Sequence, residues 1–273
     1  MSNARGGPRI PAPVAQTSPL WRWIYLRDLL LELIVRDMKL RYERSLLGVL
    51  WAIVNPLAQL MVFVIVFKHV IRLEIPNYAL YVFSGVLVWN WTSEALLQAA
   101  NAITSNRDLI RQPGFPLALL PIVSLATPLF DLLVALPILV LFVVFGGGEI
   151  TLHLLALPLV IGLQFLFLQG LGYLVASAQV LFRDTSHLLR VGLMLGFYLT
   201  PIFYDVQNVP ASFRVLYLLN PMAHLLKAYR SIIIQGELPD LVSLSVLALV
   251  SALLFWIGRR VFERASHHFV EEL

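Results

Sequence analysis

Six long apolar runs constrain the fold of this 273-residue chain more than any other feature. An α-helix rises about 1.5 Å per residue, so about 20 apolar residues cross the hydrocarbon core of a bilayer. The runs therefore predict an all-α integral membrane protein with transmembrane helices at residues 46–67, 78–99, 119–145, 150–182, 188–204 and 241–258. The fourth run is so long that it needs tilt or a break near Pro158.

Composition and missing motifs narrow the class of protein. The chain is 59% hydrophobic and 13% charged, whereas soluble domains carry about a quarter charged residues. There is no cysteine, and the six histidines are scattered, so we expect no disulfide, no catalytic residue and no metal site. The sequence also lacks the G-x-x-x-x-G-K-[ST] phosphate loop, which indicates that this chain does not hydrolyse ATP by itself.

The Lys and Arg residues predict the orientation of the chain. Fifteen of the 20 fall in segments that six spans place on one side, and five fall on the other. Basic residues in short loops stay cytoplasmic, so both termini should be cytoplasmic. The proline-rich residues 1–20 are typical of a disordered cytoplasmic tail, and residues 259–273 form a second one.

Two segments differ from ordinary spans and loops. Residues 21–45 alternate apolar and charged side chains at helical spacing, with Leu26, Leu29, Leu30, Leu33 and Ile34 on one side, which predicts an amphipathic interface helix. It could be a plain anchor or a mechanical element. Residues 205–240 predict two short re-entrant helices, at 215–219 and 222–234, serving as an outer gate or as packing.

Polar side chains within the spans are costly and usually face a bundle interior or a water-filled path. Trp51, Asn55 and Gln59 recur every four residues and share one face, and a similar polar stripe around Glu94 lies beside Trp89. The neighbouring aromatic side chains favour a polar conduit both at Asn55 and Gln59 and along the stretch from Trp89 to Glu94. Gln164 and Gln169 are interpreted as interhelical hydrogen-bonding residues, the alternative role for all of these amides.

Three further features of the spans lead to predictions. Asp131 could be a proton relay, but no charged group is evident to complete one, so we expect a buried acid that is neutral or paired with a neighbouring helix. Gly192, Gly196 and Thr200 form a small-residue face that allows close approach of two backbones. Phe197 and Tyr198 lie deeper than an aromatic belt and could stack on sugars.

Short motifs follow one another along the chain in a specific order. They are Arg36–Tyr42, Leu47–Pro56, Phe83–Gly85, Arg107–Ile110 with Phe115-Pro116, Phe182–Asp184, Thr200–Tyr204, Asn220–Met222 and Ala228–Arg230. Together they resemble the ABC-2-type permeases of bacterial polysaccharide exporters (O-antigen, capsule and teichoic acid). The resemblance covers about residues 26–236, and this family commonly has Ser where Thr200 stands.

The resemblance implies a permease homodimer in the bacterial inner membrane, joined to two separate ATPase subunits that bind ATP and Mg²⁺. No cofactor is implied for this chain. The substrate would be an undecaprenyl-diphosphate-linked polysaccharide, with O-antigen favoured over teichoic acid, capsule, drug or lipid. A membrane-embedded glycan-processing enzyme and a non-transporting scaffold remain as alternatives from other classes.

The resemblance also suggests roles for individual residues. Contact with the lipid diphosphate falls to Arg36, Lys39, Arg41 and Arg44, and coupling to the ATPase falls to Arg107, Asp108 and Phe115. The predicted channel lining is Trp51, Asn55, Gln59, Trp89, Phe197 and Tyr198. The predicted outer gate is Asn220, Pro221, Tyr229 and Arg230.

Overall fold

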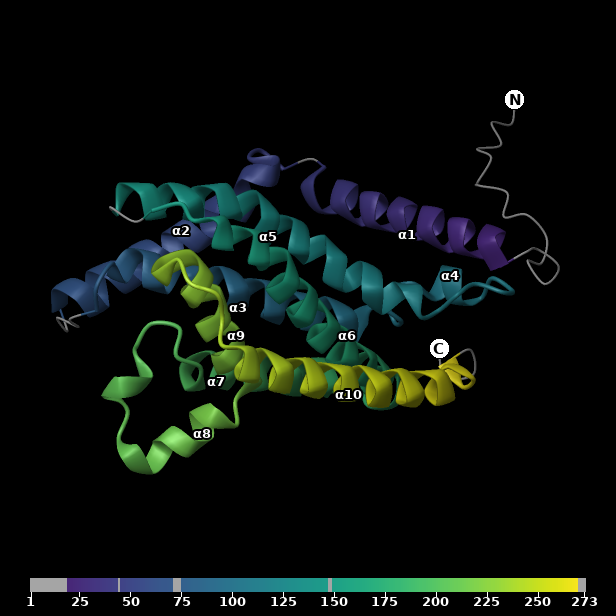
Figure 1. The fold of residues 1–273 in the computed structure, drawn as a ribbon. Helices are drawn as coiled ribbons and strands as arrows, with labels where there is room; N and C mark the ends of the chain where they lie inside the picture. Colours follow the sequence, from purple (N-terminus) through teal and green to yellow (C-terminus); the bar gives the residue numbers. More distant parts are fainter. Residues whose placement is uncertain (1–18, 44, 71–74, 147–148, 270–273) are drawn as a thin grey trace.

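The structure is a computed structural model that describes residues 19–43, 45–70, 75–146 and 149–269. Regular structure in these ranges is entirely helical, which confirms the predicted fold class at that level. The long helices lie side by side along roughly one axis, and the start of the first and the end of the last lie at the same end of the bundle (Figure 1). The tail predicted at residues 1–20 falls almost wholly outside the described residues.

The N-terminal helix α1 (Pro19–Tyr42) packs against α5 (Leu119–Phe145) and runs beside it (Figure 1). The predicted apolar side of α1 faces the bundle, and Leu33 on that side is only 6% exposed. Arg27 and Asp28 are exposed. A helix at these residues is thus observed, while an amphipathic helix in the membrane interface stays a prediction.

The next two helices pack against each other, and the second of them lies at the centre of the bundle. Helix α2 (Trp51–Phe63) follows the 3₁₀ turn η2 (Gly48–Leu50) and continues as the π-helix η3 (Val64–Val70). Helix α3 (Tyr78–Asn101) contacts α2, α5, α6, α7 and α9, so most of its side chains are buried in protein. This central position explains how α3 can carry polar side chains at depth.

The second half of the bundle begins with the one-turn helix α4 (Arg107–Ile110) and α5. The 3₁₀ turn η4 (Leu152–Ala156) then leads into α6 (Leu157–Leu181). Pro158 lies in the first turn of α6, where its missing N–H breaks no hydrogen bond. The predicted break near Pro158 is thus confirmed.

The remaining elements are a further helix, a series of short helices and turns, and the last helix. Helix α7 (Thr185–Leu199) is followed by the 3₁₀ turns η5 (Val206–Asn208) and η6 (Ala211–Phe213). Helix α8 (Arg214–Leu218), helix α9 (Pro221–Arg230) and the π-turn η7 (Ser231–Gln235) then precede α10 (Leu241–Ser266). The two short helices predicted between residues 205 and 240 are confirmed in position.

Four helical stretches among the described residues are long and apolar enough to cross a membrane, against the six predicted. They are Gly48–Val70, Leu119–Phe145, Leu152–Leu181 and Leu241–Ser266. Helix α3 mixes polar side chains such as Asn90 and Glu94 with its apolar residues, and α7 has only 15 residues. The predicted second and fifth spans are present as helices, but they do not meet the same standard of length and apolarity.

Helices α6 and α10 pack so closely that their backbones touch at two glycines. A Cβ on Gly258 would lie 2.2 Å from the carbonyl oxygen of Gly170, and a Cβ on Gly170 would lie 2.5 Å from the backbone of Leu254. The predicted close approach at α7 is wrong within this chain. A Cβ added at Gly192 would meet no atom of another element within 4 Å, and one added at Gly196 would meet the ring of Trp89 rather than a backbone.

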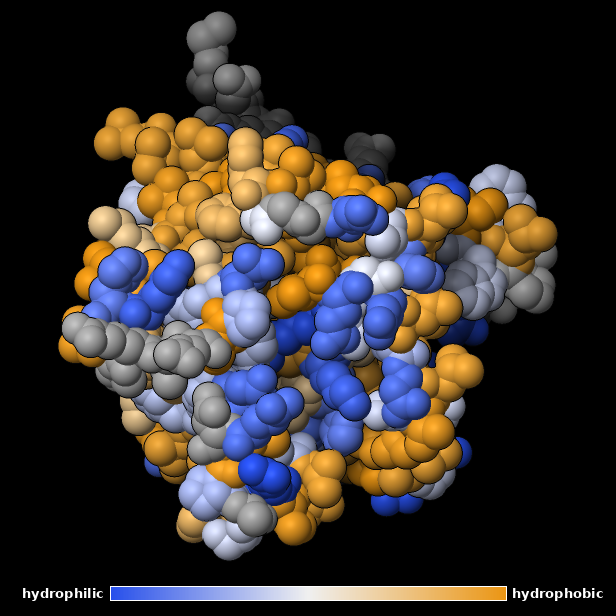
Figure 2. Space-filling view, turned by 60° about the vertical axis from the view of Figure 1, so that its left-hand side comes forward, coloured by the Kyte–Doolittle hydropathy of each residue, from blue (hydrophilic) through white to orange (hydrophobic). Residues whose placement is uncertain are grey.

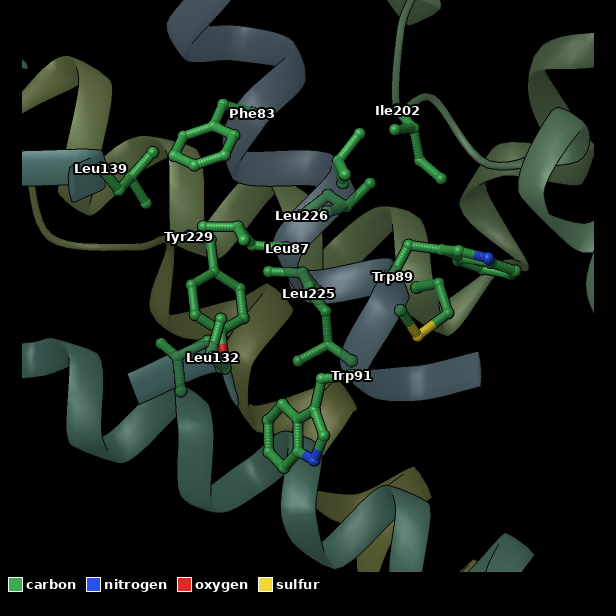
Figure 3. Packing of buried hydrophobic residues seen from close by; sticks show 14 of the residues in the cluster. Phe83, Leu87, Trp89, Trp91, Leu132, Leu139, Ile202, Leu225, Leu226 and Tyr229 are labelled. Carbon is green, nitrogen blue, oxygen red and sulfur yellow. The ribbon is translucent and has the colours of Figure 1, made fainter. Parts of the chain in front are cut away.

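Helix α9 inserts the largest part of its apolar surface into the core of the bundle. Leu225 and Leu226 are fully buried, and Tyr229 is 1% exposed. Figure 3 shows Tyr229 among side chains of α3 and α5, with Leu87 and Leu132 close to its ring. An amphipathic helix with such a buried face is anchored by apolar contact along its length.

Candidate functional site

A polar cavity of about 700 Å³ lies between the C-terminal end of α1 and the helices α2, α3 and α5. Trp51, Asn55 and Gln59 all line it, as expected of residues that share one face of α2. Asn90 and Glu94 contribute from α3, and Asp131 contributes from α5. Amides, carboxylates and an indole provide donors, acceptors and a flat apolar surface within one space.

An ion pair joins α1 to the middle of α5 at the wall of this cavity. Nη2 of Arg41 lies 2.9 Å from Oδ2 of Asp131 and 3.7 Å from Oε1 of Glu94. The side chains of Arg41 and Asp131 are 30% and 20% exposed, so water screens the pair only partly. Pairing of Asp131 with a neighbouring helix, one of the two states predicted for it, is confirmed, and Arg41 is the charged partner that the sequence did not reveal.

The tyrosine next to Arg41 reinforces the same contact. The hydroxyl of Tyr42 donates a hydrogen bond to Oδ1 of Asp131, so both carboxylate oxygens are occupied from α1. Burial, together with this hydrogen bond, raises the pKa of Tyr42 above its ordinary value. The phenol therefore remains a protonated donor across the physiological range.

The polar stripes of α2 and α3 meet across the cavity. Nδ2 of Asn90 on α3 donates to Oε1 of Gln59 on α2 over 3.1 Å. Within α3, Nε2 of Gln98 donates to Oε1 of Glu94 over 2.9 Å. Gln59 therefore both lines the cavity and bonds across helices. The interhelical hydrogen bond is thus observed, while a role of this amide in a conduit stays a prediction.

An aromatic groove of about 660 Å³ adjoins the polar cavity between α2, α3 and α7. Both spaces are lined by Gln59, Asn90 and Ser93, so they share a wall. Trp89, Phe197 and Tyr198 belong to the groove, where the ring of Trp89 meets that of Phe197 edge-on at 6.0 Å. The six residues predicted to line a channel thus fall on two adjoining spaces.

The surface outside these spaces separates polar from apolar side chains. Figure 2, turned toward the end that lies left in Figure 1, shows polar side chains gathered over the middle of the face and apolar ones around its flanks. Large apolar residues are more than half exposed on several helices, for example Met61, Tyr198 and Leu249. Apolar flanks of this extent fit contact with lipid or with another membrane subunit.

Comparison with known proteins decides the family. The family model described as "ABC-2 type transporter" matches residues 28–234. The chain is 36% identical over 249 residues to the O-antigen export system permease protein RfbA of Myxococcus xanthus, covering 90% of this chain and 96% of that protein.

This chain belongs to the ABC-2 type transporter family. It is also 29% identical to the RfbA protein of Klebsiella pneumoniae, over 91% of this chain and 96% of the relative. The polysialic acid transport protein KpsM of Escherichia coli is 25% identical over 84% of this chain and 90% of its own length. The family resemblance drawn from the motifs is confirmed, and these relatives are transport proteins rather than enzymes.

The basic residues predicted for the lipid diphosphate differ in their surroundings in this ABC-2 chain. Nη2 of Arg36 lies 2.8 Å from Oδ1 of Asp37 and 3.0 Å from Oδ1 of Asn106. Lys39 is exposed, whereas Arg41 is already paired with Asp131. Arg44 lies outside the described residues.

The residues predicted to contact the ATPase lie together near α4. Arg107 and Asp108 are exposed on that one-turn helix. Phe115 is half-buried and packs against a small apolar cluster that includes Ile110 and Phe262. Figure 1 places α4 at the same end of the bundle as the start of α1 and the end of α10.

Two of the residues predicted as an outer gate, Tyr229 and Arg230, are buried, whereas Asn220 and Pro221 are half-buried. The side chain of Asn220 caps α9 by accepting from the N–H of Met222 at 2.9 Å, and Pro221 begins the helix. Tyr229 and Arg230 are 1% and 8% exposed. A gating role for these four residues stays a prediction.

Gln164 confirms the interpretation of amides as interhelical contacts. It donates to Oγ1 of Thr92 over 2.9 Å and accepts from the hydroxyl of Tyr229 over 2.8 Å, which joins α6, α3 and α9. Gln169 differs, because its Nε2 donates to the hydroxyl of Tyr173 on the same helix over 3.2 Å. The interhelical interpretation is therefore not supported for Gln169.

Sequence reasoning missed the contact of α1 with Asp131. Arg41 and Tyr42 belong to a noted motif, but only their reach to α5 shows that both serve one carboxylate. Adjacent basic and phenolic residues at a helix end were the available signal. A lone acid at the middle of an apolar helix was the complementary signal.

Proposed function

We propose that this chain is the permease subunit that exports O-antigen as a lipid-linked polysaccharide across the bacterial inner membrane. The observation that carries the proposal is its 36% identity to an O-antigen export permease over 96% of that relative's length. Energy would come from ATP hydrolysis in a separate subunit, which would hold both ATP and Mg²⁺.

The proposed assembly is a permease homodimer with two ATPase subunits. Six spans per chain, with α3 and α7 as the second and fifth, would place both termini in the cytoplasm. The polar residues of α3 are tolerable because other helices of the bundle cover most of it. The basic residues before α2 and in the last turns of α10 support this orientation.

The glycan would follow the polar cavity and then the aromatic groove. Asn55, Gln59 and Asn90 offer hydrogen bonds to sugar hydroxyls, and Trp51, Trp89 and Phe197 offer flat apolar faces to the ring carbons. Contacts along such a path need to be weak and repeated, because each sugar must leave as readily as it arrives. The shared wall at Gln59 supports a continuous route.

Head-group capture would rest mainly on Lys39 and Arg44, with Arg36 and Arg41 as further candidates. Arginine and lysine suit phosphate oxygens, and arginine can bind them with two N–H groups at once. Arg36 fits this role less well because it pairs with Asp37, and Arg41 fits it less well because Asp131 and Glu94 already neutralise it. Capture of a diphosphate beside two carboxylates would also meet electrostatic repulsion.

Coupling to the ATPase would use the surface formed by α4 and the exposed side of α1. Arg107 and Asp108 present both charges on that surface, and Phe115 fixes the following loop to the bundle. Motion of the ATPase would reach the cavity through α1, whose end carries Arg41 and Tyr42. The re-entrant segment at residues 205–240 would form the outer gate.

Export of capsular polysaccharide is the second candidate. The polysialic acid transport protein KpsM of Escherichia coli is 25% identical to this chain, and the match covers 84% of this chain. The greater identity to O-antigen permeases places this candidate second.

Deletion of the gene tests the proposed function. We expect loss of surface O-antigen and accumulation of lipid-linked polymer inside the cell, detected with an antibody against the glycan before and after permeabilisation. Restored surface polymer on complementation with the intact gene is the control. Unchanged surface O-antigen in the deletion strain would contradict the proposal, and loss of capsule instead would favour the second candidate.

Substitution of Asn55 by leucine tests the proposed path at one residue. We expect Asn55→Leu to reduce export several-fold while the protein still assembles, because one hydrogen-bonding group of the cavity is lost. Val54→Leu is the matched control, since Val54 is 39% exposed and belongs to neither the cavity nor the groove. If the Asn55→Leu variant exports as much glycan as the Val54→Leu control, Asn55 serves only in helix packing.

A further inference from the structure

The turn between α7 and α8 is held by side chains from distant parts of the chain. Nη1 of Arg230 donates to the carbonyl oxygen of Pro201 over 2.8 Å, and Nη2 donates to that of Ile202 over 2.9 Å. Arg230 is the last residue of α9, about thirty positions further along the chain. One guanidinium therefore fixes two consecutive peptide groups outside any helix.

Two tyrosines of α3 complete the arrangement at the next two peptide groups. The hydroxyl of Tyr78 donates to the carbonyl oxygen of Phe203 over 3.0 Å, and that of Tyr81 donates to the carbonyl oxygen of Tyr204 over 2.9 Å. Four successive carbonyls thus accept from side chains of other helices. We call these three donors, Arg230, Tyr78 and Tyr81, the carbonyl clamp.

The surroundings of Arg230 are built to accommodate a guanidinium. Its Cζ lies 3.5 Å from the centroid of the Tyr81 ring, within the range of a cation–π contact. A Cβ on Gly85 would lie only 3.0 Å from Nη2, so the glycine leaves the space that this group occupies. Within the described ranges no Asp or Glu forms an ion pair with Arg230, and neutral carbonyls are its acceptors.

The clamped turn carries Phe203 into an aromatic cluster at one end of the groove. The ring centroid of Phe203 lies 5.5 Å from that of Phe63, 4.9 Å from that of Phe67 and 5.8 Å from that of Phe197. Phe63 and Phe197 also line the groove, whose other end is marked by Arg190 near the start of α7. Phe203 therefore lies just past the end of the groove that is remote from Arg190.

We propose that Arg230 is a positioning residue for export, which fixes the turn so that Phe203 closes this end of the groove while no glycan is passing. The inference rests on the groove being part of the export path. A planar fork of N–H donors can hold two carbonyls at once, which a lysine cannot reproduce. Opening would require the clamp to release the turn or to move with it.

Leak of a small solute through the idle complex tests the inference. The permease and its ATPase are reconstituted in liposomes without ATP or glycan, and efflux of trapped sucrose is measured. We expect Arg230→Met to raise the leak at least about tenfold, the scale expected when a hydrogen bond to a charged group is lost. Phe203→Ala should also raise the leak, because it removes the ring that closes the groove. Arg230→Lys should fall between these variants and the parent.

A double variant keeps the test decisive if loss of the buried arginine prevents assembly. Tyr78→Phe combined with Tyr81→Phe removes two donors to the turn but leaves both rings and the charge in place. It should also leak. The inference would be overturned if the Phe203→Ala complex and the double-variant complex both assemble and release sucrose no faster than the parent. Because the assay uses no glycan, this failure is distinct from failure of the deletion experiment.

Discussion

At the scale of single residues, the Arg41–Asp131 pair illustrates how a charge can be kept at membrane depth. Asp131 lies near the middle of α5, and Arg41 and Tyr42 occupy its two oxygens from outside that helix. A charged side chain there would otherwise be costly. The carboxylate ties the end of α1 to the wall of the polar cavity.

Removing and then exchanging the charges of Arg41 and Asp131 measures how much this ion pair contributes to the free energy of unfolding. Asp131→Ala leaves Arg41 without its nearest partner and should lower the free energy of unfolding by about 1–3 kcal/mol. The double variant Arg41→Asp with Asp131→Arg should recover part of the loss. Denaturant titration in detergent gives both values.

The control for that experiment is the exposed pair of Arg27 and Asp28. Its two side chains are 66% and 53% exposed, so Asp28→Ala should change stability little. An equal effect of Asp28→Ala and Asp131→Ala would show that burial of the second pair contributes nothing.

At the scale of helices, the close contact of α6 and α10 depends on Gly258 having no side chain. Gly258→Ala would force a methyl group against the carbonyl oxygen of Gly170 and should destabilise the bundle by about 1–3 kcal/mol. Thermal unfolding of the detergent-solubilised protein measures the change.

Gly162 on α6 provides the matched control for that substitution. A Cβ at this position would meet no atom within 4 Å, so Gly162→Ala should be neutral or stabilise the helix by up to about 1 kcal/mol. Loss of stability on Gly162→Ala comparable to that on Gly258→Ala would mean that helix contact is not the cause.

Elements with a strong local signal were predictable from the sequence. The break near Pro158 and the short helices α8 and α9 follow from proline positions and apolar length. The contact of Gly258 with Gly170 was missed because spacing on one helix does not reveal which helix lies opposite. For the same reason the small residues of α7 suggested a close approach that α6 and α10 make instead.

At the scale of the whole molecule, motifs spread over the chain converge in space. Gly85, the turn around Ile202 and Arg230 belong to three separate motifs, and all three meet at the carbonyl clamp. The sequence indicated the family through these motifs but not their common location, since their separations of about 30 to 150 residues carry no distance information. The hydroxyl of Thr200, which accepts from Asn220, is a group that serine also provides.

The orientation of the bundle is the claim on which capture, coupling and export all depend. The chain contains no cysteine, so single cysteines can be introduced without changing any other residue. We choose Asp108 on α4 and Arg264 near the end of α10 for the predicted cytoplasmic side, and Glu237 before α10 for the opposite side.

Labelling of these single-cysteine variants with an impermeant maleimide tests that orientation most directly. Intact cells should label the cysteine at position 237, whereas those at 108 and 264 should react only after permeabilisation. The reverse pattern would place α4 on the outside, where a cytoplasmic ATPase could not contact it, and would contradict the account.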